Sequence, residues 1–328
     1  MSTMKVIHIE QLGGPEVLQY TDVPRPRPGA GEALVQVEVA SVNYADTMQR
    51  RGLYPGGPQP PFIPGLEVAG RVVELGGGVN SVQEGQRVMT FVGRNGYAEF
   101  VTVPAHILMP VPEGFSVEEA AAFPIVFATA YFALKPYGRL QEGESVLIHA
   151  AGGGVGTAAV QLAKRLGARV FATASSDDKL QRVRELGADE LINYRTHDFT
   201  EVVRQITGGR GVDLILETVG SEVFEKSFDA LAPFGRLVTY GAASGKVGMA
   251  DARRIILNNI TVAGVNLNLL ARSRQMAGGM SELLQLIQGT NIRPIIGHRF
   301  ALSQAADAHR LLESRDSFGK IVLKPGSS

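Results

Sequence analysis

Hydrophobic positions divide the chain into two patterns. Up to about residue 110, short β-branched and apolar runs are separated by turns rich in glycine and proline. The runs lie at 6–9, 33–41, 67–75, 87–91 and 98–103. Their close spacing predicts an antiparallel, barrel-like fold, which a helical stretch over 43–51 and a proline-rich loop over 54–64 interrupt.

From Ser145 onward, apolar strands alternate with segments in which hydrophobic residues recur at helical spacing. The strand 212–217 is apolar enough to be buried on both faces, as in a parallel sheet. Six such strands joined by helices predict a doubly wound parallel sheet of the Rossmann type. We expect its strands at 146–148, 169–173, 190–193, 212–217, 236–240 and 261–265.

A glycine-rich turn follows the first of these strands and opens the first helix. It contains Gly152, Gly153, Gly154, Val155 and Gly156. Without a side chain, Gly153 lets a phosphate approach the backbone, and Gly156 lets the helix press against the strand. The unpaired amides at the helix start, including that of Val155, attract an anion. The sequence therefore predicts a dinucleotide-binding turn, although an ordinary strand–helix turn is the alternative.

The end of the second strand indicates which dinucleotide binds. Ala174 stands where an NAD site usually has an acidic residue, so nothing there repels a 2′-phosphate. Ser175 and Lys179 can bind that phosphate, and Tyr194 can reach the adenosine-side phosphate. We expect NADPH as the cofactor. Alternatively, Lys179 is an ordinary solvated helix lysine and Tyr194 an ordinary surface tyrosine. In the glycine turn, Ala151 stands where the dinucleotide-binding fingerprint has its first glycine, which is a mild departure from that pattern.

Composition and charge narrow the class of protein. Among the 328 residues, 32 Lys and Arg balance 32 Asp and Glu without long runs of one sign, so we expect that nucleic acid is not the main partner. The absence of cysteine excludes disulfides and cysteine zinc sites. No apolar run reaches membrane-spanning length, and the first residues lack a signal-peptide core. A cytoplasmic protein with no membrane partner is the expectation.

Several motifs together resemble the zinc-independent quinone oxidoreductase branch of the medium-chain dehydrogenase/reductase superfamily, which includes zeta-crystallin. They are IHAAGGGVGTAAVQLAK, ATASSDDKLQRVRELGAD, DLILETVG, FGRLVTYG, SVNYADTMQRRGLYPG, FIPGLEVAGRVVELGGGV and FGKIVLKP. The resemblance implies a GroES-like β-barrel domain over 1–124, an NADP-binding Rossmann domain over 125–265, and a return segment over 266–328 that completes the barrel domain. It also implies an active site between the domains and a homodimer or homotetramer.

The zinc alcohol dehydrogenases of the same superfamily differ at two positions. They have a cysteine where this chain has Asn43 and a histidine where it has Leu66. A leucine offers no metal donor, so we expect neither catalytic nor structural zinc. Without a Lewis acid, the acceptor must already be reactive toward hydride, as quinones and electron-poor alkenes are.

The resemblance also locates candidate site residues. It places nicotinamide and ribose contacts at Asn43, Thr129, Thr218, Gly241 and Ser244. For catalysis we choose Asn43 and Tyr54, since each can hydrogen-bond a quinone oxygen as it gains negative charge. Tyr54 merely shaping its loop is the alternative, and Asp46 is a weaker candidate that is equally typical of an ordinary helix acid.

Three functions follow from these observations. The first is an NADPH:quinone oxidoreductase that passes hydride from nicotinamide C4 to a quinone. The second is an NADPH-dependent reductase of α,β-unsaturated carbonyls or enoyl thioesters. The third is a non-catalytic NADPH-binding protein. The sequence alone does not separate them.

Overall fold

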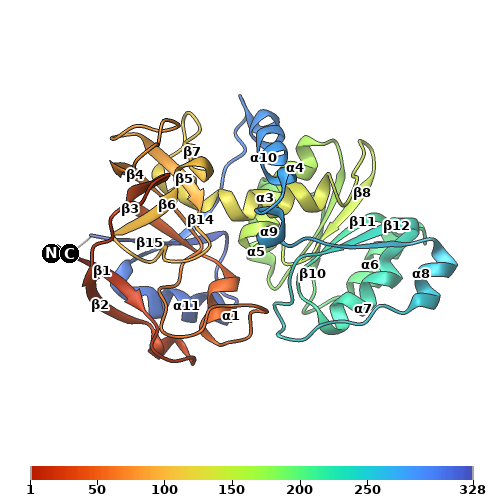
Figure 1. Ribbon diagram of the computed structural model, residues 1–328. Helices are drawn as coiled ribbons and strands as arrows, with labels where there is room; N and C mark the ends of the chain where they lie inside the picture. Colours follow the sequence, from red (N-terminus) through yellow and green to blue (C-terminus); the bar gives the residue numbers. More distant parts are fainter. Residues whose placement is uncertain (1, 327–328) are drawn as a thin grey trace. The chain divides into compact units, whose positions relative to one another are not determined.

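The computed structural model describes residues 2–326 of the 328-residue chain. Contacts divide it into two compact units (Figure 1), which are described separately. Unit 1 contains the residues up to 125 and those from 293 on, and unit 2 contains residues 126–292. No helix among the described residues is both long and apolar enough to cross a membrane.

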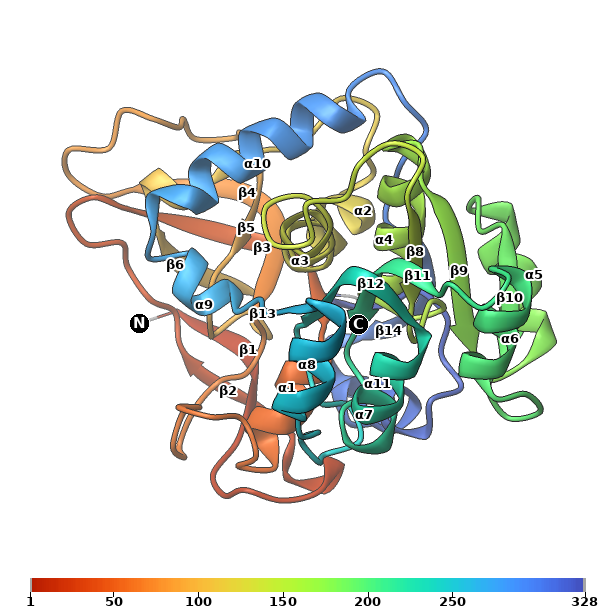
Figure 2. The same cartoon turned by 90° about the vertical axis from the view of Figure 1, so that its right-hand side faces the viewer.

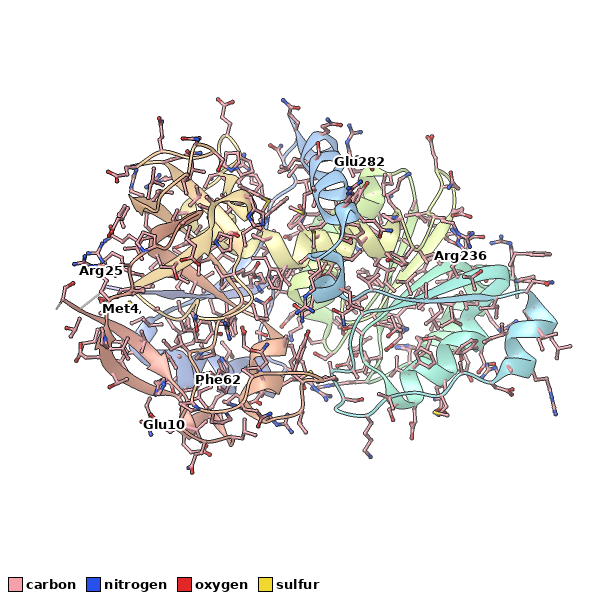
Figure 3. The ribbon with its side chains drawn as sticks, in the orientation of Figure 1. Met4, Glu10, Arg25, Phe62, Arg236 and Glu282 are labelled. Atoms are coloured by element: carbon pink, nitrogen blue, oxygen red, sulfur yellow. The ribbon has the colours of Figure 1, made fainter. Side chains whose placement is uncertain are left out.

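Unit 1 is built on a seven-stranded sheet in the order β14-β15-β3-β4-β5-β7, with β6 also paired to β3. Every pair in it is antiparallel except β14–β15. A separate hairpin, β1–β2, is attached through a bridge between Val6 and Ala98 and one between Ile9 and Phe62. Figure 3 labels Met4 and Phe62 in this part of the unit. The strands are β1 Thr3–His8, β2 Gln19–Pro24, β3 Glu32–Val42, β4 Glu67–Leu75, β5 Arg87–Phe91, β6 Phe100–Pro104, β7 Met109–Pro110, β14 Ile296–Ala301 and β15 Lys320–Lys324.

The helices of unit 1 are α1 Tyr44–Arg50, α2 Val117–Ala122 and α11 Ala305–Ser314, with short 3₁₀ turns at Pro15–Val17, Ala105–Ile107 and Leu302–Gln304. Ser116 and Glu119 form a capping box at the start of α2. Valine and isoleucine side chains from β3, β4, β5 and β15 form the core, and α11 adds Ala305 and Ala308 to it. The C-terminal residues are therefore an integral part of the N-terminal unit.

Unit 2 contains the predicted parallel sheet. Its order is β10-β9-β8-β11-β12-β13, all parallel, which is the doubly wound Rossmann arrangement. The strands are β8 Ser145–Ile148, β9 Arg169–Ala174, β10 Glu190–Asn193, β11 Val212–Glu217, β12 Leu231–Thr239 and β13 Thr261–Gly264. The connecting helices are α4 Gly154–Arg165, α5 Asp177–Glu185, α6 Phe199–Ile206, α7 Ser221–Ala230 and α8 Ala252–Asn258. The predicted fold class is confirmed.

Three further helices complete unit 2: α3 Pro124–Leu134, which spans the boundary at 125, α9 Leu267–Leu270 and α10 Arg274–Ile287. Figure 2 views α3 along its axis with α10 beside it. Tyr131 of α3 donates a hydrogen bond to Glu282 of α10, labelled in Figure 3, and Gly279 leaves room for the Phe132 ring. These contacts pack α10 on α3, and residues 266–292 belong to unit 2, whereas the sequence placed 266–328 entirely in the return segment.

Candidate functional site

The glycine turn lies at the carboxyl end of β8, beside β9 and β11. The amide of His149 donates to Leu216 O at 3.1 Å, and that of Ala151 donates to Thr173 O at 2.9 Å. Helix α4 begins at Gly154, and no side chain caps its first turn. The amides at the start of a twelve-residue helix therefore stay available for an anion.

Close packing requires a glycine at Gly156 of this turn but not at Gly153. A Cβ on Gly156 would lie 2.4 Å from Ala150 O and 2.6 Å from Ala151 Cα, so a side chain would push α4 away from the turn. A Cβ on Gly153 would meet only Ala150 O, at 3.3 Å, and otherwise open space. Ala150 itself has a left-handed φ of 51°. Gly153 therefore lies on the open side of the turn, where the pyrophosphate is predicted to bind.

His149 supports the turn from the interior. Its Nδ1 lies 3.1 Å from Thr173 Oγ1, and its Nε2 lies 3.2 Å from Ser227 Oγ. Because the Ser227 hydroxyl donates to Val223 O, it must accept from His149, which places the ring proton on Nε2. Burial lowers the pKa of His149 to about 3, so the neutral ring supports the turn through its two hydrogen bonds.

The candidate 2′-phosphate residues lie at the ends of neighbouring strands. Ala174 ends β9 and pairs with Asn193 at the end of β10, so Ser175 and Tyr194 follow on adjacent strands. The Tyr194 side chain is exposed, and its amide donates to Ala174 O at 3.2 Å. Lys179 lies in the first turn of α5, where its amide donates to Ser176 Oγ at 3.4 Å. No acidic residue ends β9.

Two loops at the carboxyl ends of β11 and β12 carry three more candidate cofactor residues, Thr218, Gly241 and Ser244. The amides of Ala243 and Ser244 donate to Thr218 O and Val219 O at 2.8 and 2.9 Å. A Cβ on Gly241 would lie 2.6 Å from Thr218 Oγ1, so only glycine allows this approach. The two loops are therefore joined, and Thr218, Gly241 and Ser244 lie in one assembly.

Glu217, the last residue of β11, fixes this assembly. Its buried Oε1 accepts the amides of Val219 and Gly220 at 2.5 and 2.7 Å, and Oε2 lies 3.4 Å from Thr239 Oγ1. Burial raises the pKa of Glu217, and the two backbone amides oppose that shift. The buried carboxylate thus orders the turn that presents Thr218.

Asn43, chosen as a catalytic residue, belongs to a buried polar cluster in unit 1. Its Nδ2 donates to Glu67 Oε1 at 3.0 Å and approaches Ser41 O at 3.4 Å. Its Oδ1 accepts from Lys320 Nζ at 2.7 Å. Asn43 retains 7% of its surface, while Glu67 has none. The side-chain carboxamide of Asn43 is therefore hydrogen-bonded through both its nitrogen and its oxygen.

A second set of buried hydrogen bonds starts in the first turn of α1. Asp46 Oδ2 accepts the Asn43 amide at 2.8 Å and the Tyr97 hydroxyl at 3.0 Å. The Tyr97 oxygen also lies 3.2 Å from His309 Nε2 on α11. Burial raises the pKa of Asp46 to about 7, and it lowers that of His309 to about 3. Asp46 thus lies in the first turn of α1, where it accepts the amide of the N-cap residue Asn43 as a helix acid does, and it is also fully buried.

The last two candidates, Tyr54 and Thr129, lie on either side of the unit boundary in the sequence. Tyr54 is partly buried in the loop after α1, where its carbonyl accepts the Gly57 amide at 2.9 Å. Thr129 is buried on α3. The roles of Tyr54 and Thr129 toward substrate and cofactor stay predictions.

Sequence reasoning missed five buried polar residues that shape these sites. A charged residue inside an apolar run signals Glu217 and Glu67, since a buried carboxylate needs partners. No local sequence pattern identifies Tyr97, His309 or Lys320, because their hydrogen-bond partners are distant in the sequence. The five residues are Glu67, Tyr97, Glu217, His309 and Lys320.

The residues of the chain do not fit a zinc ion. There is no cysteine in the sequence. Among the described residues, no three His, Asp or Glu side chains gather as a metal site would require. At Asn43 and Glu67, the ammonium of Lys320 already occupies the oxygen atoms.

Two protein families match the chain. The family described as "Alcohol dehydrogenase GroES-like domain" matches residues 29–113. The family described as "Zinc-binding dehydrogenase" matches residues 154–285. The first match lies within unit 1, and the second lies within unit 2.

Similar proteins carry several names. A Bos taurus quinone oxidoreductase-like protein 2 is 36% identical, covering 91% of this chain and 86% of that protein. A Burkholderia 2-haloacrylate reductase is 34% identical, covering 97% of this chain and 98% of that protein. The human synaptic vesicle membrane protein VAT-1 homolog is 35% identical, covering 94% of this chain and 83% of that protein. The chain also matches 14% of the length of a Mycobacterium tuberculosis phenolphthiocerol/phthiocerol polyketide synthase, at 34% identity.

A solved structure extends the likeness to the whole chain. The Escherichia coli quinone oxidoreductase complexed with NADPH is 32% identical, with a TM-score of 0.91 over 99% of this chain and 100% of that one. The chain, which has Asn43 and Leu66 where zinc alcohol dehydrogenases have metal ligands, thus shares its fold with this quinone oxidoreductase.

Proposed function

Because the chain belongs to the quinone oxidoreductase branch of the medium-chain dehydrogenase/reductase superfamily, we propose that it is an NADPH-dependent quinone reductase. The cofactor is NADPH, which supplies a hydride from nicotinamide C4 when bound. The observation that carries the proposal is the uncapped glycine turn at the carboxyl end of β8, next to a β9 that ends without an acid.

Residues of unit 2 have distinct roles in this proposal. The turn from Gly152 to Gly156 binds the pyrophosphate through backbone amides, Val155 among them. Ser175, Lys179 and Tyr194 bind the adenosine end and its 2′-phosphate. The remaining contacts orient the nicotinamide and its ribose, at Thr129, Thr218, Gly241 and Ser244.

Residues of unit 1 handle the acceptor. Asn43 and Tyr54 donate hydrogen bonds to the oxygen of the quinone that gains negative charge, which lowers the free energy of the transition state. Overall, a quinone, NADPH and one proton give a hydroquinone and NADP⁺, so two electrons reach the acceptor with the hydride. The proton on the second oxygen comes from solvent or from a donor in the site.

The test is turnover by the purified protein. NADPH oxidation is followed by its loss of near-ultraviolet absorbance with 1,4-benzoquinone and with 9,10-phenanthrenequinone, and NADH serves as the matched cofactor. We expect turnover with NADPH and a much higher KM with NADH. Tight NADPH binding without turnover of any acceptor would contradict the reductase and favour a non-catalytic NADPH-binding protein.

A second candidate is an NADPH-dependent reductase of electron-poor alkenes, including α,β-unsaturated carbonyls and enoyl thioesters. The 2-haloacrylate reductase among the similar proteins favours it, because a haloacrylate is an alkene conjugated to a carboxylate. Here hydride adds to the carbon β to the carbonyl, and a proton adds to the α carbon. A higher kcat/KM with 2-alkenals or 2-haloacrylate than with quinones would select this candidate.

We also propose a homodimer, formed through one edge of the unit 2 sheet. β13 is an edge strand, and the neighbouring α8 exposes Ile256 and Leu257 at 73% and 74%. A two-fold axis would pair β13 antiparallel with a second copy and cover these side chains. Light scattering after size exclusion tests it, and Leu257→Lys should give monomers. The homotetramer and the cytoplasmic location stay predictions.

A further inference from the structure

Lys320 reaches the predicted catalytic residue Asn43 through the strand order of unit 1. β15 pairs antiparallel with β3, and β3 pairs antiparallel with β4. The register aligns Ile321 with Val42, and Ser41 with Glu67. Lys320, Asn43 and Glu67 therefore meet at one end of three adjacent strands. The C-terminal return segment supplies the lysine of this trio.

The ammonium of Lys320 is fully coordinated by oxygen. Its Nζ donates to Val42 O at 2.9 Å, to Asn43 Oδ1 at 2.7 Å and to Glu67 Oε1 at 2.9 Å. An ammonium has three protons, so each has an acceptor. Lys320 is 4% exposed, and the other carboxylate oxygen of Glu67 accepts the Ile125 amide at 2.8 Å. The charges of Lys320 and Glu67 therefore balance, and the polar atoms of this buried pair have hydrogen-bond partners.

This arrangement fixes the orientation of the Asn43 amide. A lysine only donates, so the oxygen of Asn43 must face Lys320 and its NH₂ group must face Glu67. Of the two Nδ2 protons, one makes the 3.0 Å bond to Glu67, and the other has only the long 3.4 Å approach to Ser41 O. A cation on the carbonyl oxygen also polarises the amide and strengthens its N–H groups as donors.

We propose that Lys320 is a positioning residue of the reductase. It holds and polarises the Asn43 carboxamide, so that the second Nδ2 proton is donated to the acceptor oxygen as that oxygen becomes negative. The inference rests on the proposed function. It assigns to a residue of the last strand a part in acceptor reduction, which it plays through Asn43.

Chemical rescue tests the inference, because the chain contains no cysteine. A single Lys320→Cys variant is alkylated in denaturant with 2-bromoethylamine, which rebuilds an ammonium on a side chain of nearly equal length, and is then refolded. We expect Lys320→Cys to lose roughly 100-fold in kcat, comparable to the loss of one transition-state donor. The Kd for NADPH, measured by calorimetry, should change less than about threefold, and alkylation should restore most of kcat.

Two further variants separate positioning from stability. Removing one partner of any buried ion pair destabilises a protein. Arg236, labelled in Figure 3, is the control in unit 2, since its guanidinium is buried against Glu144 and Gly138 O. Arg236→Met should lower the unfolding temperature and leave kcat unchanged. The double variant Glu67→Gln with Lys320→Met removes both charges, keeps a packed interior and should stay slow even if Lys320→Cys fails to fold.

The outcomes decide between the possibilities. Wild-type kcat in Lys320→Cys or in the folded double variant would overturn the inference and leave the reductase proposal standing. An alkylated protein that regains stability but not kcat would also overturn it. If the wild type reduces neither quinones nor alkenes, the proposed function fails first, and the role of Lys320 falls with it.

Discussion

Replacing Asp46 with asparagine should make the stability of unit 1 less dependent on pH. The Asp46 carboxyl is buried, and burial raises its pKa to about 7 from the ordinary value of 3.8. The folded state therefore holds a proton at pH values where the unfolded chain has lost it. The unfolding free energy is unaffected by this group below about pH 4, falls as pH rises from about 4 to about 7, and then levels off.

The size of the effect follows from the pKa difference. About three units at about 1.4 kcal/mol each give a loss of about 4 kcal/mol between about pH 4 and about pH 8. In Asp46→Asn the amide oxygen can still accept from the Asn43 amide and the Tyr97 hydroxyl, but the side chain does not ionise. The variant should match the wild type near about pH 4 and exceed it by up to about 4 kcal/mol near about pH 8.

Scanning calorimetry from about pH 4 to about pH 8 measures this difference. For a unit of this size, about 4 kcal/mol corresponds to roughly 10 °C in the unfolding temperature. His149 and His309, whose pKa burial lowers to about 3, contribute an opposite slope to both proteins, which cancels in the comparison. Asp22→Asn, at an exposed acid, is the control. A wild-type-to-variant difference that stays constant across this pH range would refute the reasoning.

Three other predictions concern the nucleotide site and unit 2. Lys179→Ala should raise the KM for NADPH roughly tenfold by removing a charged phosphate contact, and equal changes for NADPH and NADH would refute the 2′-phosphate assignment. Gly153→Val should abolish NADPH binding in calorimetry while far-UV circular dichroism stays unchanged, and unaltered affinity would count against the turn as the pyrophosphate site. In α10, Gly278→Ala should stabilise by about 0.5–1 kcal/mol, since a Cβ there meets nothing within 4 Å. Gly279→Ala should destabilise instead, because its Cβ would lie 2.4 Å from Phe132 Cζ; thermal unfolding of both variants decides.

The fold was largely predictable because its signals are local. Apolar runs, glycine turns and helix caps lie within a few residues of one another, and they predicted the six parallel strands of unit 2. The strand β2 was missed, since Gln19–Pro24 is polar and mostly exposed. The boundary after β13 was misplaced, because the packing of α10 on α3 depends on contacts between residues 151 positions apart, such as Tyr131 and Glu282.

The candidate site was predictable to a smaller extent. The glycine turn and the acid-free end of β9 form a continuous pattern, so the cofactor half was accessible from the sequence. The surroundings of Asn43 depend on pairing between β3, β4 and β15. No spacing rule connects Glu67 with Lys320, 253 positions later. Tertiary pairing of this kind leaves no periodic signal in a single sequence.

The position of β15 between β14 and β3 has a consequence for biosynthesis. On the ribosome, unit 2 can be completed while the final strands of unit 1 are still being translated. Until they arrive, the growing N-terminal part carries an unfilled sheet edge beside β3 and a carboxylate at Glu67 without its counter-ion. Nascent chains arrested before residue 293 should therefore depend on chaperones for the first unit and much less for the second.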